Sequence, residues 1–226
     1  TRETHLGFLL QGAFRTTPSR DNIKEDEPDN HRLIHDAATL LVSSLREAKR
    51  LKLLDVNMLS ALPLEPGKFA ADSIFRPVYE AARDALKTEL LIPAYKGGYV
   101  SGEDALIGRG NKLHALLSPE QLGQLMDQGR PLRWVSPVIT KDQHGQLRTY
   151  LLEEVIGRKE VRPETLISKF PGENWVLNGN NFLEQQNDDT WWGRLYAFLG
   201  TQSALWEQLK NKKFIVPETG ELQAPF

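Results

Sequence analysis

Residues 11–23 read QGAFRTTPSRDNI, and the rest of the chain is organised around this stretch. It places Arg15 and Arg20, with two threonines and a serine, between the apolar run Leu6 to Leu10 and a long amphipathic segment. A strand that feeds a polar loop at the start of a helix commonly presents side chains and helix amides to an anion. The stretch therefore predicts a phosphate-contacting loop.

Apolar residues on both sides of this loop predict a strand before it and a helix after it. The run Leu6 to Leu10 predicts a short buried strand that Gly12 ends. The helix is expected to be capped by Asp29 or Asn30 and to cover about 24 residues, or about 36 Å. Its apolar residues recur at steps of three and four, which predicts one buried stripe: Ile34, Ala37, Leu41, Leu45, Ala48 and Leu51.

The remaining chain alternates helical patterns with short strand patterns. Residues 70–90 have helical spacing, with Pro77 in the first turn. The segment LLIPAYKGGYVSGEDAL, residues 90–106, predicts a β-hairpin that turns at Gly97 and Gly98. Further expected elements are a helix started by Ser118-Pro119-Glu120-Gln121, a strand over Leu132 to Ile139, a helix over Leu147 to Ile156 that Gly157 ends, a short helix from Pro163 to Phe170, a loop over Asn174 to Asn181, and helices through Trp191 to Leu199 and Ala204 to Leu209.

Two distant segments have similar sequence patterns. LLIPAYKGGYVS (residues 90–101) and KFIVPETGELQA (residues 213–224) each run from apolar residues through a proline and a glycine to a returning stretch. Each also follows a helical pattern, which predicts two related helix-hairpin units. We therefore expect a mixed α/β fold with a first unit over residues 1–110 and a second over 111–226, joined near Gly108 to Asn111.

Composition excludes several classes of function. The 226 residues include 28 basic and 30 acidic side chains, so a formal charge of −2 gives no general attraction to nucleic acid or an anionic membrane. The absence of cysteine excludes disulfides and thiolate chemistry. No apolar run approaches the roughly 20 residues of a membrane span. We expect a cytoplasmic protein that does not enter a membrane and, since the chain lacks an initiator Met, a fragment of a longer one.

The stretch 11–23, the helix after it and the segment 90–106 together resemble bacterial proteins with a sacsin-like ATP-binding domain. These belong to the GHKL superfamily, which includes the ninety-kilodalton heat-shock chaperones. In those chaperones the middle domain supplies a catalytic loop that ends in a Ser-Arg-acid motif and leads into a helix. Ser19-Arg20-Asp21 looks like that motif, and the resemblance is best over residues 1–110.

The resemblance implies that Arg20 reaches the γ-phosphate of ATP, as an arginine finger does, with Arg15 as a second catalytic group. ATP and Mg²⁺ would be bound mainly by a preceding nucleotide-binding domain, and the loop would couple nucleotide state to a chaperone-like conformational change. A second copy in a homodimer, and a client protein or nucleic acid, are further candidate partners that the sequence leaves open. The nucleotide-binding residues it implies are Gln11, Thr16, Thr17 and Ser19.

The chain departs from the family pattern in two places. The chaperones carry a glutamine four residues after the arginine, where this chain has Lys24, and Gln11 is the candidate replacement. The chain also contains no Asp-x-Gly-x-Gly nucleotide-pocket signature. We therefore do not expect this chain to hydrolyse ATP alone.

Each of these signals has a purely structural alternative. Arg20 could pair with Asp21 or with the acidic spacer that follows, and Arg15 could be solvated, as most loop arginines are. Trp191, Trp192 and Tyr196 could stack on bases, but their helical spacing favours core packing. His31 and His35 have a metal-compatible spacing without a third ligand, so we expect no metal site.

Two other classes of function remain open at this stage. One is a non-catalytic binding scaffold in a bacterial nucleic-acid or phage-defence system, for which Lys210, Lys212 and Lys213 are the basic candidates. The other is a small-molecule enzyme, for which the sequence offers no convergent acid-base groups.

Overall fold

A computed structural model of the chain describes residues 4–109, 111–126, 129–157, 160–172, 181–186, 188–216 and 222–225. The fold is mixed α/β, as predicted, with helices and very short strands. The chain forms two compact units, Thr1–Ala105 with Val138–Arg158 and Leu106–Pro137 with Lys159–Phe226. The division expected near residue 110 lies close to the first boundary, between Ala105 and Leu106. The sequence did not predict that residues 138–158 return to the first unit.

The long helix after the arginine-containing loop is α1, Pro28–Arg50. Its 23 residues agree with the predicted length, and its buried side chains follow one stripe that includes Ile34 and Leu45. The predicted cap at Asp29 or Asn30 is wrong, because the helix begins at Pro28, whose missing N–H costs nothing in the first turn. The Asn30 side chain instead bonds to the preceding loop.

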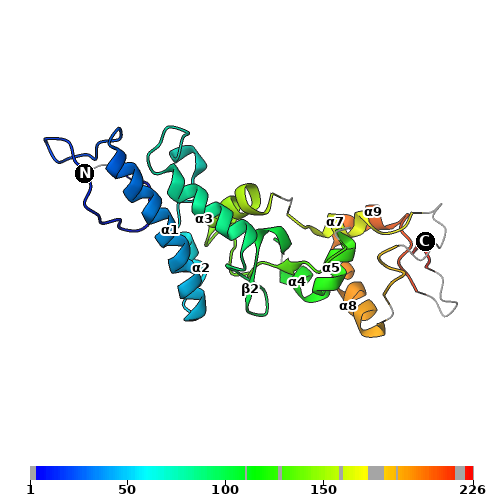
Figure 1. Ribbon diagram of the computed structural model, residues 1–226. Coiled ribbons are helices and arrows are strands. Elements are labelled where there is room, and N and C mark those ends of the chain that lie inside the picture. Colours follow the sequence, from blue (N-terminus) through cyan, green and yellow to red (C-terminus); the bar gives the residue numbers. More distant parts are fainter. Residues whose placement is uncertain are drawn as a thin grey trace. The chain divides into compact units, whose positions relative to one another are not determined.

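Helix α3, Arg76–Thr88, packs along α1 within the first unit (Figure 1). It places Pro77 in its first turn, as predicted. The connection between the two helices contains the short helix α2, Val56–Ser60, and the 3₁₀ turn η1, Pro66–Lys68. The fully buried Ile34, Leu45, Ala82 and Leu86 show that the core of this unit lies along the two long helices.

The predicted hairpin after α3 is confirmed. Strands β1, Ile92–Pro93, and β2, Tyr99–Val100, pair antiparallel. Gly97 and Gly98 make the turn with φ angles of 92° and 73°, a region that glycine adopts without steric cost. The Tyr99 hydroxyl donates a 2.8 Å hydrogen bond to the Leu54 carbonyl, which fixes the hairpin to the segment that follows α1.

Residues 138–158 complete the first unit. Helix α6, Gly145–Tyr150, continues as a π-helix, η3, Leu151–Ile156, and Gly157 ends it at a φ of 62°, as predicted. The π-helix packs on α3 and on the 3₁₀ turn η2, Gly102–Asp104. A Cβ at Gly102 would lie 2.7 Å from Val155 Cγ1, so the close approach requires glycine there.

The second unit begins at Leu106, the last residue of strand β3, Ala105–Leu106, which pairs with β4, Arg133–Trp134. The strand predicted over Leu132 to Ile139 is therefore much shorter. Helix α4 covers Asn111–Leu116. The start of α5, Pro119–Leu125, is the predicted capping box: Ser118 Oγ accepts from the Gln121 N–H, and Gln121 reaches back to the Ser118 N–H.

The later helices of the second unit enclose an aromatic core. They are α7, Pro163–Ser168, α8, Asp189–Gly200, the 3₁₀ turn η4, Ser203–Leu205, and α9, Trp206–Leu209. Trp191 and Trp192 are buried on α8, and the Trp191 indole N–H donates to the Leu116 carbonyl. The prediction of core packing rather than base stacking is confirmed for these two tryptophans.

The second predicted hairpin is present where the structure describes it. Ile215 and Gln223 form an antiparallel bridge with hydrogen bonds in both directions. Its turn lies outside the described residues, as does nearly all of the loop predicted over Asn174 to Asn181.

The strand predicted over Leu6 to Leu10 is wrong. This segment is irregular, and the Leu9 side chain is 89% exposed. At Gly7 the chain passes close to the Ala61 backbone, where a Cβ would lie 2.4 Å from the Ala61 carbonyl oxygen. The apolar run has no neighbouring strand among the described residues, so its backbone cannot form a ladder.

Candidate functional site

Residues 15–24, which we call the arginine loop, form a small closed hairpin before α1. Thr16 and Ile23 make an antiparallel bridge, and the Lys24 N–H donates to the Arg15 carbonyl at 3.0 Å. At the tip, the Arg20 N–H donates to the Thr17 carbonyl at 2.9 Å. The loop therefore has a defined backbone although its side chains are largely exposed.

Asn30 fixes the arginine loop to α1. Its side-chain oxygen accepts from the Arg15 N–H at 2.8 Å, and its amide nitrogen donates to the carbonyls of Arg15 and Lys24 at 2.8 and 2.7 Å. Asn30 is completely buried, so these backbone groups would lose their partners without it. Sequence reasoning missed this role, although Asn30 stands four residues before Ile34 on the buried stripe.

Arg20 lies at the exposed tip of the loop. Its φ angle of 58° is in the left-handed region, which residues other than glycine rarely adopt. Within the part of the chain that the structure describes, the Arg20 guanidinium makes no ion pair. Its charge is therefore available to a ligand or partner.

Asp21 is bonded to two hydroxyls rather than to Arg20. Both the Ser19 and the Thr17 hydroxyl donate to Asp21 Oδ1, the latter at 2.8 Å. The hydrogen bond from Ser19 has the larger effect and that from Thr17 the smaller, and together they lower the pKa of Asp21 below its usual value. The alternative in which Arg20 pairs with Asp21 is thus not the observed arrangement.

Arg15 lies at the base of the loop and faces the start of α1. Its guanidinium is 3.8 Å from Asp29 Oδ2, and Arg32 lies 3.4 Å from the other oxygen of the same carboxylate. The structural alternative for Arg15 is a solvated side chain; the side chain is indeed 66% exposed, but its guanidinium also lies beside the Asp29 carboxylate. Gln11 is exposed, and the described residues give its side chain no hydrogen bond to the loop.

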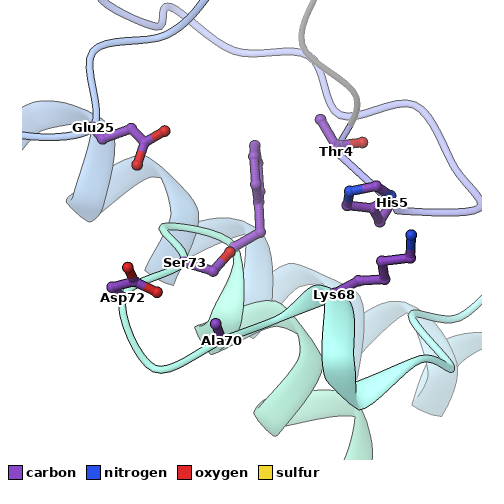
Figure 2. A pocket seen from close by; sticks show the side chains of 8 residues that line it. Thr4, His5, Glu25, Lys68, Ala70, Asp72 and Ser73 are labelled. Carbon is purple, nitrogen blue, oxygen red and sulfur yellow. The ribbon is translucent and has the colours of Figure 1, made fainter.

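A small pocket of about 190 Å³ adjoins the end of the arginine loop through Glu25. Figure 2 shows His5 and Lys68 on one side of it, with Glu25 and Asp72 on the other. Opposite charges on facing walls do not make a cradle for an anion. The volume is also below the roughly 300 Å³ at which ligand pockets begin. The pocket therefore adds no phosphate site to the loop.

Other sequence candidates do not form sites in the described residues. His31 and His35 belong to no group of three metal-ligating side chains there. Of the basic end of α9, Lys210 pairs with Glu207 at 2.7 Å and Lys212 donates to the Phe170 carbonyl. None of the helices described is both long and apolar enough to cross a bilayer.

Replacing Asn30 by alanine is expected to release the arginine loop. The change removes three hydrogen bonds, each contributing about 0.5–1.5 kcal/mol, so local opening should become easier by about 2 kcal/mol. Amide hydrogen exchange at Arg15 and Lys24 should then accelerate by roughly 30-fold. Asn57→Ala, which removes an exposed amide far from the loop in sequence, is the control; equal exchange rates in both variants would contradict the role assigned to Asn30.

Comparison of the chain with protein-family models, with curated proteins and with solved structures finds no match in any of the three.

Proposed function

We propose that the arginine loop completes an ATP site whose nucleotide and Mg²⁺ are bound mainly by a preceding domain. Arg20 contacts the γ-phosphate and stabilises the charge that develops during its transfer. The observation that carries this proposal is the exposed Arg20 at the loop tip, without an ion pair among the described residues. The neighbouring Asp21 accepts from Ser19 and Thr17 instead.

The hydrogen bonds that attach the arginine loop to α1 suit such a role. An arginine that acts on a transferred phosphoryl group contributes most when its position is fixed before the reaction. Asn30 supplies this fixation, because it bonds both ends of the loop and is itself buried on α1. The Arg20 side chain thus extends from a closed backbone hairpin.

The same connection offers a route from nucleotide state to conformational change. A pull on Arg20 would be transmitted through the loop backbone to Asn30, and from there to α1, which packs on α3. A phosphate that is bound and then released would therefore favour different positions of the loop and α1 relative to α3. This is the chaperone-like coupling that we propose.

The other loop residues take lesser parts in the proposal. The hydroxyls of Thr17 and Ser19 already donate to Asp21, so they hold the tip in shape and would contact phosphate only after exchanging that partner. Arg15 would have to leave Asp29 to reach a phosphate. Arg20 is therefore the residue on which the proposal depends.

Replacing Arg20 by alanine in the full-length protein is expected to lower ATP turnover at least tenfold. This value is conservative, because an arginine that stabilises the transferred charge raises turnover by a factor of order 10³ or more in some enzymes. Nucleotide affinity, measured by calorimetry, should stay nearly unchanged because other residues would bind the nucleotide. The matched control is Arg32→Ala, an exposed arginine on α1 that pairs with Asp29. Equal turnover in the two variants would overturn the assignment.

A further inference from the structure

A second, larger cavity lies within the first unit, away from the arginine loop in sequence. It has a volume of about 570 Å³ and is formed by two segments, residues 64–68 around η1 and residues 146–154 of α6 and η3. This volume falls within the range of small-molecule pockets, roughly 300–1,000 Å³. No residue of the arginine loop lines it.

The charged side chains of the cavity are mainly acidic. Glu65, Glu153 and Glu154 line it together with one cation, Lys68, so its lining carries a formal charge of −2 (one basic and three acidic groups). Glu65 and Glu153 are exposed, and neither carboxylate makes an ion pair among the described residues. Two carboxylates are thus available to a positively charged group.

The rest of the lining is apolar and aromatic. Leu64, Pro66 and Tyr150 contribute to it, and Tyr150 is only 2% exposed. The Tyr150 hydroxyl is buried and has no hydrogen-bond partner among the described residues. Such an unpaired buried hydroxyl is unusual in a folded protein, and it belongs to a side chain that lines the cavity.

Two further features give the acidic wall a fixed shape. Glu154 accepts a 2.9 Å hydrogen bond from the Tyr79 hydroxyl of α3, which anchors the wall to the core. Glu153 and Glu154 also lie in the π-helix η3. Short π-helical turns within α-helices occur frequently at functional sites, because they redirect side chains that a regular helix would place elsewhere.

We propose that this cavity binds a small organic cation, an alkylammonium or alkylguanidinium group. The carboxylates of Glu65 and Glu153 face its charge, while Leu64, Pro66 and Tyr150 contact its alkyl part. An aromatic surface beside carboxylates is the usual environment of such cations. The group belongs either to a free small molecule or to a lysine or arginine side chain of a partner.

The test is a titration of the isotope-labelled chain followed by amide NMR shifts. The probe is n-butylguanidinium, and the neutral analogue n-butylurea has a similar size without the charge. We expect saturable shifts confined to residues 64–68 and 146–154 with the cation and none with the urea. A second arm uses an acetylated, amidated Gly-Arg-Gly peptide: tighter binding of the peptide identifies an arginine side chain as the source, and tighter binding of butylguanidinium identifies a free cation.

Variants of the acidic wall test the assignment of its residues. Glu153→Gln should weaken butylguanidinium binding by roughly two- to fivefold, as expected for the loss of one exposed charge contact, and Glu65→Gln should act in the same direction. The matched control is Glu164→Gln, an exposed glutamate of α7 in the second unit. The proposal is overturned by the absence of saturable shifts with either cationic probe, by equal shifts with butylurea, or by affinity that neither variant changes.

Discussion

Replacing Trp191 by alanine is expected to lower the free energy of unfolding of the second unit by about 4 kcal/mol, since truncation of a buried aromatic residue typically costs 3–5 kcal/mol. Trp191 is 1% exposed, and its ring packs edge-on against Phe182 with centroids 5.8 Å apart. Its indole N–H also donates a buried 2.9 Å hydrogen bond to the Leu116 carbonyl. Alanine would therefore leave both a cavity and an unpaired carbonyl.

The measurement is urea unfolding followed by far-ultraviolet circular dichroism. Trp206→Ala is the matched control, because Trp206 lies on α9 in the same unit and is 53% exposed. A change at such a surface position is expected to stay within about 0.5 kcal/mol. Similar losses for the two tryptophans would show that Trp191 is not the centre of this core.

The first unit is expected to lose stability at alkaline pH through Tyr79. The pKa of Tyr79 is raised to about 12, mainly by burial and to a lesser extent by the hydrogen bond to Glu154. In an unfolded chain the pKa of tyrosine is about 10. The neutral hydroxyl thus stabilises the folded state fully below pH 10, and this contribution is lost as the pH rises through 12. Two pKa units correspond to about 3 kcal/mol.

Urea unfolding at a series of pH values between 8 and 12 measures this loss. Tyr150, which is also buried, has its pKa raised in the same direction, so the wild-type chain should show the combined decline. Tyr79→Phe removes one of the two titrating groups, and its stability should fall less steeply above pH 10 than that of the wild type. Parallel curves for the two proteins would contradict the assignment to Tyr79.

Elements with strong local signals could be predicted from the sequence. The glycines at 97 and 98 determine their own turn, and Ser118 and Gln121 satisfy each other's backbone groups within a single helical turn. Gly157 likewise ends its helix by adopting a left-handed conformation. In each case the interacting residues are neighbours in the chain, so no tertiary information is required.

Elements that depend on distant partners could not be predicted in this way. The apolar run Leu6 to Leu10 has the composition of a buried strand, but a strand also needs a pairing partner, which composition does not reveal. Asparagine is a preferred N-cap residue, so the sequence predicted that Asn30 caps the helix. Its side chain instead forms hydrogen bonds with Arg15, fifteen residues earlier. A tertiary hydrogen bond thus overrode the local preference of Asn30, whereas Leu6 to Leu10 have no pairing strand among the described residues.

The same limit applies to the candidate site, whose loop could be predicted from the sequence although the partners of its side chains could not. The stretch 11–23 identifies an arginine-rich loop, and its exposure follows from its polarity. Only the resemblance of Ser19-Arg20-Asp21 to a family motif distinguished the two arginines, because both stand near acidic residues. Only the folded loop directs Arg15 towards Asp29 and leaves the Asp21 carboxylate to Ser19 and Thr17. Likewise, the acidic cavity joins segments that are about 80 residues apart and share no motif.

The return of residues 138–158 to the first unit affects how the chain acquires its structure during synthesis. The Tyr79 hydroxyl donates its hydrogen bond to Glu154, a glutamate 75 positions later, and the π-helix that covers α3 lies beyond the opening segment of the second unit. Contacts of such long sequence separation slow folding, because a large loop must close before they form. The first unit can therefore be completed on the ribosome only after residues 106–137, which belong to the second unit, have emerged.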